Sequence, residues 1–198
     1  MEARQAIAEE APVDRVLSRL GDRCIVLIGM MGAGKTSIGR RLATVLHLPF
    51  VDADVEIERA ANLSIPEIFS HYGEAHFREG ERRVVARLLS SGPAVLATGG
   101  GAFICEETRA RCREHGVTVW LKADVSVLLE RVRKKGNRPL LEKPDPDGVM
   151  RRLLAEREPV YALADIAVAS REGPHHALVG EIIAALDAHL AKEPALAG

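Results

Sequence analysis

The sequence lacks an excess of charge of either sign. Its 198 residues include 27 Lys and Arg against 28 Asp and Glu, which leaves a formal net charge of -1. Such a balance gives no electrostatic reason to expect binding to nucleic acid or to an anionic membrane surface. Long hydrophobic runs are lacking as well, since none approaches the roughly 18 residues of a membrane-spanning helix. We therefore expect neither a nucleic-acid-binding protein nor a membrane protein.

Cysteine is scarce, with single residues at Cys24, Cys105 and Cys112 and no C-x-x-C spacing. We interpret them as reduced structural thiols, which favours a reducing cytoplasm; a metal-binding or catalytic role is the alternative. The N-terminal segment also lacks the apolar core of a secretory signal peptide, and its acidic residues argue against an organelle-targeting peptide. A cytoplasmic location is therefore expected.

The length predicts one domain with a substantial core. We expect residues 23–198 to form this domain and residues 1–22 to form an N-terminal extension, either docked or loose. Within the extension, the pattern VDRVLSRLG predicts a short amphipathic helix that ends at Gly21. We expect the protein to be a monomer.

Short apolar segments alternate with amphipathic segments along the main domain. The first segment, RCIVLIG, holds a continuous apolar run, which is typical of a strand buried on both faces of a parallel sheet. Alternating strands and helices predict βαβ units with right-handed crossovers. The sequence thus predicts an α/β protein, with a three-layer α/β/α fold around a central five-stranded parallel sheet. The predicted strands are 23–29, 49–54, 94–98, 117–123 and 165–170.

One segment interrupts this alternation, residues 135–149, with the sequence KGNRPLLEKPDPDGV. It is rich in proline, glycine and charge and lies between two predicted helices. Such a composition is typical of a surface segment rather than of a core element. We interpret this segment as a mobile lid.

A phosphate-binding motif lies at residues 29–36, where GMMGAGKT fits the pattern G-x-x-x-x-G-K-[ST] between a predicted strand and a predicted helix. The glycines allow backbone N–H groups to turn toward phosphate oxygens, assisted by the positive end of the helix. Lys35 is placed to reach the β- and γ-phosphates, and the Thr36 hydroxyl to ligate Mg²⁺. A chance glycine turn before a helix is the alternative, which this context disfavours. The predicted residues of the nucleoside triphosphate site are Gly32, Ala33, Gly34, Lys35, Thr36 and Ser37.

Two carboxylates, Asp52 and Asp54, end the second predicted strand. In an extended segment, side chains two residues apart point to the same side. One of them could hold a water on Mg²⁺, and the other a substrate hydroxyl. The alternative is that Asp54 is the N-cap of the next helix, and the spacing favours neither interpretation.

A second glycine cluster, residues 99–101, follows the third predicted strand in VLATGGGAF. Three consecutive glycines cost backbone entropy on folding, so their presence requires a structural reason. At the carboxyl end of a parallel strand they allow a small polar ring to lie against bare backbone N–H groups. The alternative is a flexible turn after a buried strand.

The chain resembles the shikimate kinases in six segments that follow one another in the order GMMGAGKTSIGRRLA, FVDADVEIE, FREGE, LATGGGA, RPLL and EREPVY. These kinases are P-loop enzymes of the nucleoside-monophosphate-kinase type, and the resemblance runs from about residue 23 to the C-terminus. The P-loop is shared by many families, whereas the combination of D-x-D, F-R, T-G-G-G and R-P-L-L is specific. The resemblance implies that ATP and shikimate are the substrates and that Mg²⁺ is required. The product would be shikimate 3-phosphate, in chorismate and aromatic amino-acid biosynthesis.

The resemblance also implies which residues bind the acceptor. It assigns the carboxylate of shikimate to Arg78 and Arg157, which suits the planar fork of a guanidinium. Asp54 matches the position that hydrogen-bonds the acceptor hydroxyls and helps to deprotonate the attacking one. The second glycine cluster, Gly99, Gly100 and Gly101, matches the wall of the acceptor pocket.

On the nucleotide side, the resemblance places Asp52 near the Mg²⁺. Arg138 matches a lid arginine that closes over the phosphates, and together with Lys35 and Asp54 it completes the predicted catalytic set. Arg171 falls in a loop that contacts adenine in that family. The lid is short for the family, and the N-terminal extension is additional to it.

Three other functions stay open on the sequence. A kinase for another small metabolite, such as gluconate, shares the P-loop and the size but does not require T-G-G-G together with Arg78 and Arg157. A nucleoside-monophosphate kinase would carry a D-G-[FY]-P-R stretch, which this sequence lacks. A catalytically idle ATP-binding module would usually have lost the P-loop lysine or an acceptor arginine, and both are present.

Overall fold

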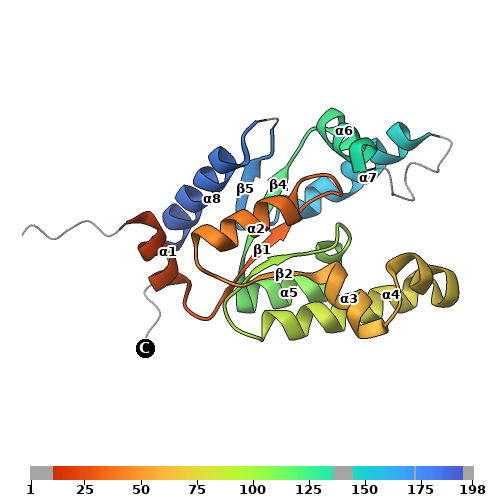
Figure 1. The fold of residues 1–198 in the computed structure, drawn as a ribbon, viewed down its shortest axis with the longest axis horizontal. Helices are drawn as coiled ribbons and strands as arrows, with labels where there is room; N and C mark the ends of the chain where they lie inside the picture. Colours follow the sequence, from red (N-terminus) through yellow and green to blue (C-terminus); the bar gives the residue numbers. More distant parts are fainter. Residues whose placement is uncertain (1–10, 136–144, 172, 194–198) are drawn as a thin grey trace, which may run out of the picture.

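The computed structural model of the chain describes residues 11–135, 145–171 and 173–193. Its centre is a five-stranded sheet with the strand order β2-β3-β1-β4-β5, in which neighbouring strands are parallel (Figure 1). The predicted α/β class and the central five-stranded parallel sheet are confirmed. The strands are β1 Cys24–Ile28, β2 Phe50–Asp52, β3 Val95–Ala97, β4 Gly116–Lys122 and β5 Ile166–Ala169.

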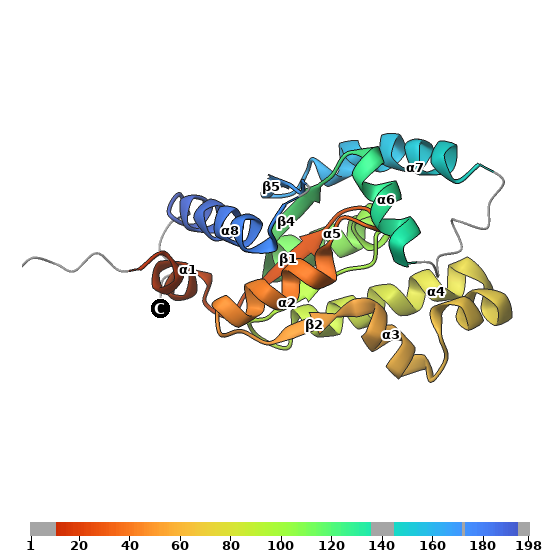
Figure 2. The same ribbon diagram turned by 45° about the horizontal axis from the view of Figure 1, so that its top comes forward.

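Helices cover both faces of this sheet. Helices α2 and α8 pack on each other over one face, and α4 and α5 pack on each other over the opposite face (Figure 1 and Figure 2). The predicted three-layer arrangement is therefore confirmed. No helix within the described ranges is long and apolar enough to cross a membrane. The helices are α1 Pro12–Leu20, α2 Lys35–Val45, α3 Ala53–Ala61, α4 Ile65–Leu89, α5 Glu106–His115, α6 Val125–Lys135, α7 Pro146–Tyr161 and α8 His175–Leu190, with a short 3₁₀ helix η1 at Ala102–Ile104.

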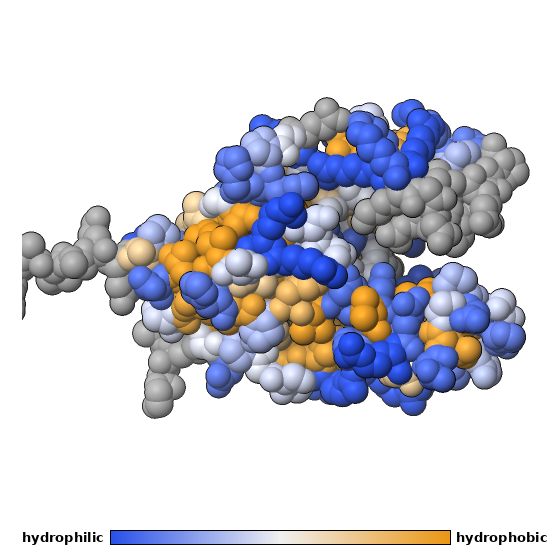
Figure 3. All heavy atoms as spheres, viewed as in Figure 1, coloured by the Kyte–Doolittle hydropathy of each residue, from blue (hydrophilic) through white to orange (hydrophobic). Residues whose placement is uncertain are grey.

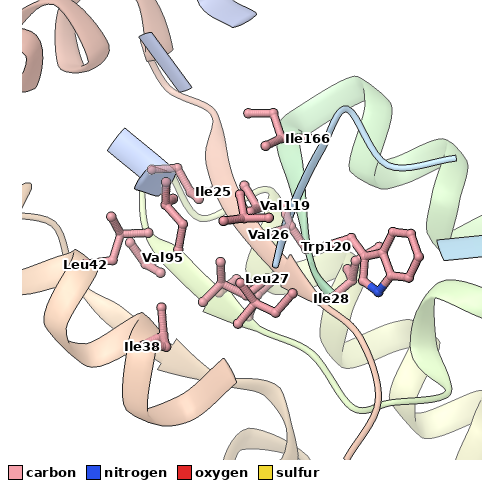
Figure 4. Close-up of a cluster of buried hydrophobic side chains, with 14 of the residues drawn as sticks. Ile25, Val26, Leu27, Ile28, Ile38, Leu42, Val95, Val119, Trp120 and Ile166 are labelled. Atoms are coloured by element: carbon pink, nitrogen blue, oxygen red, sulfur yellow. The ribbon is translucent and has the colours of Figure 1, made fainter. Parts of the chain in front are cut away.

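Strand β1 forms the middle of the core, and all five of its residues are buried. Ile25 pairs with Val95 of β3 on one side and with Val117 of β4 on the other. Ile38 and Leu42 of α2 pack against this part of the sheet (Figure 4). Because helices cover both faces, the continuous apolar run of this strand is what its position requires. The rigid sheet fixes the direction in which the chain leaves β1 toward the first glycine loop.

Helix α1 docks on α8. Its Val16 and Leu20 are buried in the main core. On its polar side, Arg15 and Arg19 both form ion pairs with Asp187, at 2.6 Å and 2.9 Å. On the face drawn in Figure 3, apolar side chains gather around α1 and α8. The described part of the N-terminal extension is therefore docked rather than loose.

Helix α4 is interrupted at Gly73, whose φ of 78° and ψ of 174° are not helical. Gly73 thus divides the helix into two parts. Ser64 and Glu67 form a capping box at the start of the first part. Behind the second part, Ile57 of α3 and Phe77 belong to a small apolar cluster apart from the main core. Helices α3 and α4 thus pack on each other beside the carboxyl end of β2.

The predicted lid, 135–149, is helical at both ends. Helix α6 continues to Lys135, and α7 begins at Pro146. Asp145 caps α7 by accepting a hydrogen bond from the Gly148 N–H at 2.9 Å. A reading of composition alone missed this Asp-Pro helix start, which pairs an N-cap residue with proline at the first helical position. Residues 136–144 lie outside the described part of the chain.

Candidate active site

A cavity of about 340 Å³ opens at the carboxyl ends of the central strands. It lies between the loop after β1, the end of β2 and the loop after β3, which are adjacent in the sheet. Ligands of open α/β sheets bind at this edge. The cavity brings together the predicted residues Gly32, Gly34, Lys35, Thr36, Ser37, Asp52, Asp54 and Gly100.

The first glycine loop, residues 29–34, has a left-handed backbone at Gly29, Gly32 and Gly34. Gly32 has a φ of 83°, and a Cβ there would lie 2.8 Å from the carbonyl oxygen of Leu128. Gly34 has a φ of 97° and forms the N-cap of α2. Residues that carry a side chain rarely adopt this left-handed backbone conformation. The N-terminus of α2 and its N–H groups therefore face the cavity, as a phosphate site requires. Ala33 is buried and does not line the cavity.

Lys35 lies across the same loop. Its Nζ donates hydrogen bonds to the carbonyl oxygens of Gly29 and Met30, at 2.7 Å and 2.9 Å. An ammonium has three donors on a flexible stem, so it can exchange these partners for phosphate oxygens. The predicted phosphate-binding lysine is thus held within the loop that it serves.

Thr36 and Asp52 lie next to each other in the cavity. The Thr36 hydroxyl donates a 2.9 Å hydrogen bond to Oδ2 of Asp52. The other oxygen, Oδ1, accepts a 3.1 Å hydrogen bond from the backbone N–H of Asp54, so that Asp52 is the N-cap of α3. The alternative that Asp54 caps this helix is wrong, because the helix begins at Ala53, two residues before the start at Val55 that this alternative requires. Asp54 is placed at the cavity by the first helical turn rather than by an extended segment.

A hydroxyl beside a carboxylate is an oxygen donor set of the kind that Mg²⁺ prefers. Mg²⁺ in nucleotide sites is usually held by one or two such side chains, with waters and phosphate oxygens as its other ligands. Thr36 and Asp52 fit this pattern, and both line the same cavity as the phosphate-binding loop.

The second glycine cluster allows charged side chains to approach the backbone. A Cβ on Gly99 would lie 2.7 Å from Oε1 of Glu81 and 3.0 Å from Oδ1 of Asp54. A Cβ on Gly101 would lie 2.5 Å from Nη1 of Arg78. A side chain at Gly99 or Gly101 would therefore displace the carboxylate of Glu81 or the guanidinium of Arg78. Glycine at these two positions leaves room for both charged groups beside the loop, whereas a Cβ on Gly100 would lie at ordinary contact distance from its neighbours.

Arg78 is held by two acidic partners on α4. Its Nη1 donates to Oε2 of Glu81 at 2.7 Å, and its Nη2 donates to Oε1 of Glu74 at 3.1 Å. The Arg78 side chain is 31% exposed, whereas that of Glu81 is 4% exposed. A buried carboxylate thus fixes the arginine beside the glycine cluster.

Glu81 is the functional candidate that sequence reasoning missed. Within the described residues, its Oε1 has no hydrogen-bond partner. Burial raises the pKa of this carboxyl, while the hydrogen bond and charge of Arg78 oppose the rise. Asp54 adds to the rise and Arg157 opposes it, which places both near Glu81. Its spacing of three residues from Arg78 on a helix could have indicated the ion pair, but no sequence signal indicated the burial.

Arg157 reaches the second glycine cluster from α7. Its Nη1 donates to the carbonyl oxygen of Gly100 at 3.3 Å and lies 3.9 Å from Sδ of Met30. The structure therefore brings Arg78 and Arg157 to the same loop from two helices far apart in sequence. This juxtaposition provides two guanidinium groups beside two carboxylates, Asp54 and Glu81.

A smaller cavity of about 150 Å³ continues from the phosphate-binding loop toward the loop after β5. Arg171 lines it, as predicted for the adenine side, together with Pro174 and His175. Arg131, to which the sequence assigned no role, also lines both cavities. It donates to Oγ of Ser170 at 2.9 Å and to the carbonyl oxygen of Arg171 at 2.8 Å. The predicted lid arginine, Arg138, lies outside the described residues.

A family model for shikimate kinase matches residues 31–187. The shikimate kinase of Bradyrhizobium diazoefficiens is 59% identical over 187 residues, which cover 94% of this chain and 90% of that protein. The shikimate kinase of Rhodopseudomonas palustris is 55% identical, with 96% and 94% covered. The 187 residues matched in the first of these proteins exceed the length of 23–198, so the match includes part of residues 1–22.

Among solved structures, shikimate kinase from Acinetobacter baumannii in complex with shikimate is 40% identical, with a TM-score of 0.78 over 81% of this chain and 90% of that chain. A gluconokinase from Sinorhizobium meliloti shares the fold, with a TM-score of 0.52 at 21% identity over 86% of this chain and 93% of that chain. The parallel sheet and the glycine loop before α2 define a P-loop protein, and the relatives at 59% and 55% identity show that it is a kinase. Within that class, the chain belongs to the shikimate kinase family.

Proposed function

We propose that this protein is a shikimate kinase, which transfers the γ-phosphate of ATP to the 3-hydroxyl of shikimate and releases ADP and shikimate 3-phosphate. This reaction belongs to the biosynthesis of chorismate and the aromatic amino acids. One observation carries the proposal: the phosphate-binding loop shares one cavity with Asp54 and Gly100 of the second glycine cluster, and the guanidinium groups of Arg78 and Arg157 lie against that cluster. Two substrates bound in these places would have their reacting groups side by side, which is the main requirement of a phosphoryl transfer.

ATP would bind with its phosphates over the first glycine loop and the N-terminus of α2. Backbone N–H groups at positions 32–37 and the hydroxyls of Thr36 and Ser37 supply donors there. Lys35 would move its ammonium from the carbonyls of Gly29 and Met30 to the β- and γ-phosphates. We assign the Mg²⁺ of the nucleotide to Thr36 and Asp52, and this ion, when bound, neutralises charge on the phosphates.

Shikimate carries one carboxylate and three ring hydroxyls. Arg78 and Arg157 would bind the carboxylate, since guanidinium groups can do so through paired hydrogen bonds. Asp54 and Oε1 of Glu81 would accept hydrogen bonds from ring hydroxyls, which gives the buried Oε1 a partner. We assign Asp54 as the group that accepts the proton of the attacking hydroxyl, because it lies in the cavity shared with the phosphate-binding loop.

Two further roles rest on the resemblance to the family. Arg138 would contact the transferring phosphoryl group from the segment between α6 and α7. Arg171 would contact the adenine side, together with Arg131, since both face the smaller cavity. We also propose that the protein is a cytoplasmic monomer, a setting that suits its free thiols Cys24, Cys105 and Cys112.

The test is ADP release from Mg-ATP measured with shikimate, with gluconate and without an acceptor. We expect rapid release with shikimate alone, and shikimate 3-phosphate as the product by mass spectrometry. Equal slow release in all three reactions would identify a P-loop ATPase or an ATP-binding module and would overturn the proposal. Faster release with gluconate than with shikimate would identify gluconate as the acceptor.

A further inference from the structure

Tyr161, the last residue of α7, is buried beside β4, the phosphate-binding loop and the second glycine cluster. It is 1% exposed, and its ring centroid lies 6.0 Å from that of Trp120 in β4. Its hydroxyl donates a hydrogen bond to the carbonyl oxygen of Gly100 and lies 3.7 Å from Sδ of Met30. Burial raises the pKa of this hydroxyl, which keeps it protonated and able to donate at neutral pH. Tyr161 does not line the cavity.

The two glycine loops touch each other at this place. A Cβ on Gly100 would lie 3.5 Å from the carbonyl oxygen of Gly29 and 3.5 Å from the backbone nitrogen of Met31. Met30, between these residues, is 2% exposed. A single buried hydroxyl therefore contacts both the phosphate-binding loop and the loop of the second glycine cluster.

Glycine has the widest backbone freedom of any residue, so three in succession do not fix their own peptide planes. The plane between Gly100 and Gly101 is instead held through the Gly100 carbonyl, by Tyr161 and by Arg157. A peptide unit is planar and trans, so its N–H points away from its C=O. The hydrogen bond from Tyr161 thereby sets the direction of the Gly101 N–H, in a residue that lies directly against Arg78.

We propose that Tyr161 is a positioning residue for the acceptor. Its hydroxyl holds the Gly100–Gly101 peptide so that backbone donors and Arg78 present one arrangement to shikimate. The inference rests on the proposed function, since it assigns a role in binding that acceptor. Tyr161 does not line the cavity, so it would act through the Gly100 carbonyl and through Arg157, with which its side chain also interacts.

The test is Tyr161→Phe, which keeps the buried ring and removes the hydroxyl. One neutral hydrogen bond of this kind corresponds to about a tenfold change in affinity. We expect the KM for shikimate to rise about tenfold, with the KM for ATP and kcat within about twofold of the parent values. The rise in Tm that shikimate causes in the absence of ATP should shrink in parallel, which reports binding independently of turnover.

Thr118→Val is the matched control. Thr118 is a buried hydroxyl that bonds Oδ2 of Asp165 at 2.6 Å, between β4 and the start of β5. This variant is expected to lower Tm without changing the KM for shikimate. If Tyr161→Phe lowers Tm but leaves that KM unchanged, or fails to fold, the hydroxyl is structural and the inference is wrong. Failure of the parent protein to use shikimate would instead remove the proposed function.

Discussion

The hydroxyl of Thr36 and the carboxylate of Asp52 are joined by a hydrogen bond of 2.9 Å. The bond links the first turn of α2 to the end of β2, two elements that the chain forms 16 residues apart. It places two oxygen ligands on one side of the phosphate-binding loop. The same carboxylate caps α3 and so fixes the position of Asp54. One side chain thus arranges the proposed metal-binding side of the site and one wall of the proposed acceptor side.

Asp52→Asn should raise the Mg²⁺ concentration needed for half-maximal activity by about tenfold, because a charged ligand becomes neutral. Asparagine is as good an N-cap as aspartate, so the start of α3 and the Tm should be kept. The measurement is a Mg²⁺ titration of the initial rate at fixed ATP. Asp145→Asn, which changes the N-cap of α7, is the control and should leave the titration unchanged. An unaltered Mg²⁺ dependence in Asp52→Asn would remove this residue from the metal site.

Arg78→Ala should raise the KM for shikimate by about two powers of ten while ATP binding stays intact. It removes a guanidinium from the proposed acceptor pocket, and loss of one partner of a buried charge pair across a binding interface costs roughly 2–5 kcal/mol of affinity. Steady-state kinetics with each substrate varied in turn makes the measurement. Arg82→Ala is the control, because Arg82 lies one turn further along α4 and pairs with the exposed Glu107 at 3.7 Å. Equal KM values for the two variants would contradict the assignment of Arg78.

Glu81→Gln should become more stable relative to the parent protein as the pH rises. Burial raises the pKa of Glu81 above its ordinary value of 4.5, so the folded state binds this proton more tightly than the unfolded state does. The parent protein therefore loses stability relative to the variant as the pH rises through the pKa of the folded state. Urea unfolding of both proteins between about pH 4 and pH 8 checks this. A difference in unfolding free energy that does not vary with pH would show that Glu81 has no raised pKa.

Val16→Ala should destabilise the protein without changing catalysis. Val16 is fully buried between α1 and the core, and truncation of such a residue costs about 1–3 kcal/mol. For a domain of this size the cost lowers Tm by several degrees. Val45→Ala is the control, since it makes the same truncation at a residue of α2 that is 43% exposed. If the two variants have equal Tm values, α1 does not dock in solution as described.

The features that the sequence predicted well are those whose cause is local. The apolar run at 23–29 indicates a central strand, because a strand covered by helices on both faces needs apolar side chains on both sides. This requirement can be recognised without knowing which segments cover the strand. The P-loop pattern specifies its own conformation, because Gly32 and Gly34 adopt backbone angles that few other residues tolerate. Both predictions needed only one stretch of chain.

The features that it missed depend on contacts between distant segments. The role of Tyr161 depends on Gly100, which is 61 residues away, and that of Arg131 on Ser170, which is 39 residues away. No pattern within either segment indicates such a pairing. The alternative that Asp54 is the N-cap of α3 was wrong for a smaller reason, since it depends on a helix boundary that differs by two residues.

Helix α8 begins at His175, beside the smaller cavity, and its last residues lie alongside α1. Its 16 residues span about 24 Å at the rise of an α-helix. A surface tether or fusion partner attached ahead of Pro12 would therefore sit at the far end of a rigid rod from the nucleotide. Immobilised in this way, the enzyme would present its proposed substrate sites to the solution, away from the tether.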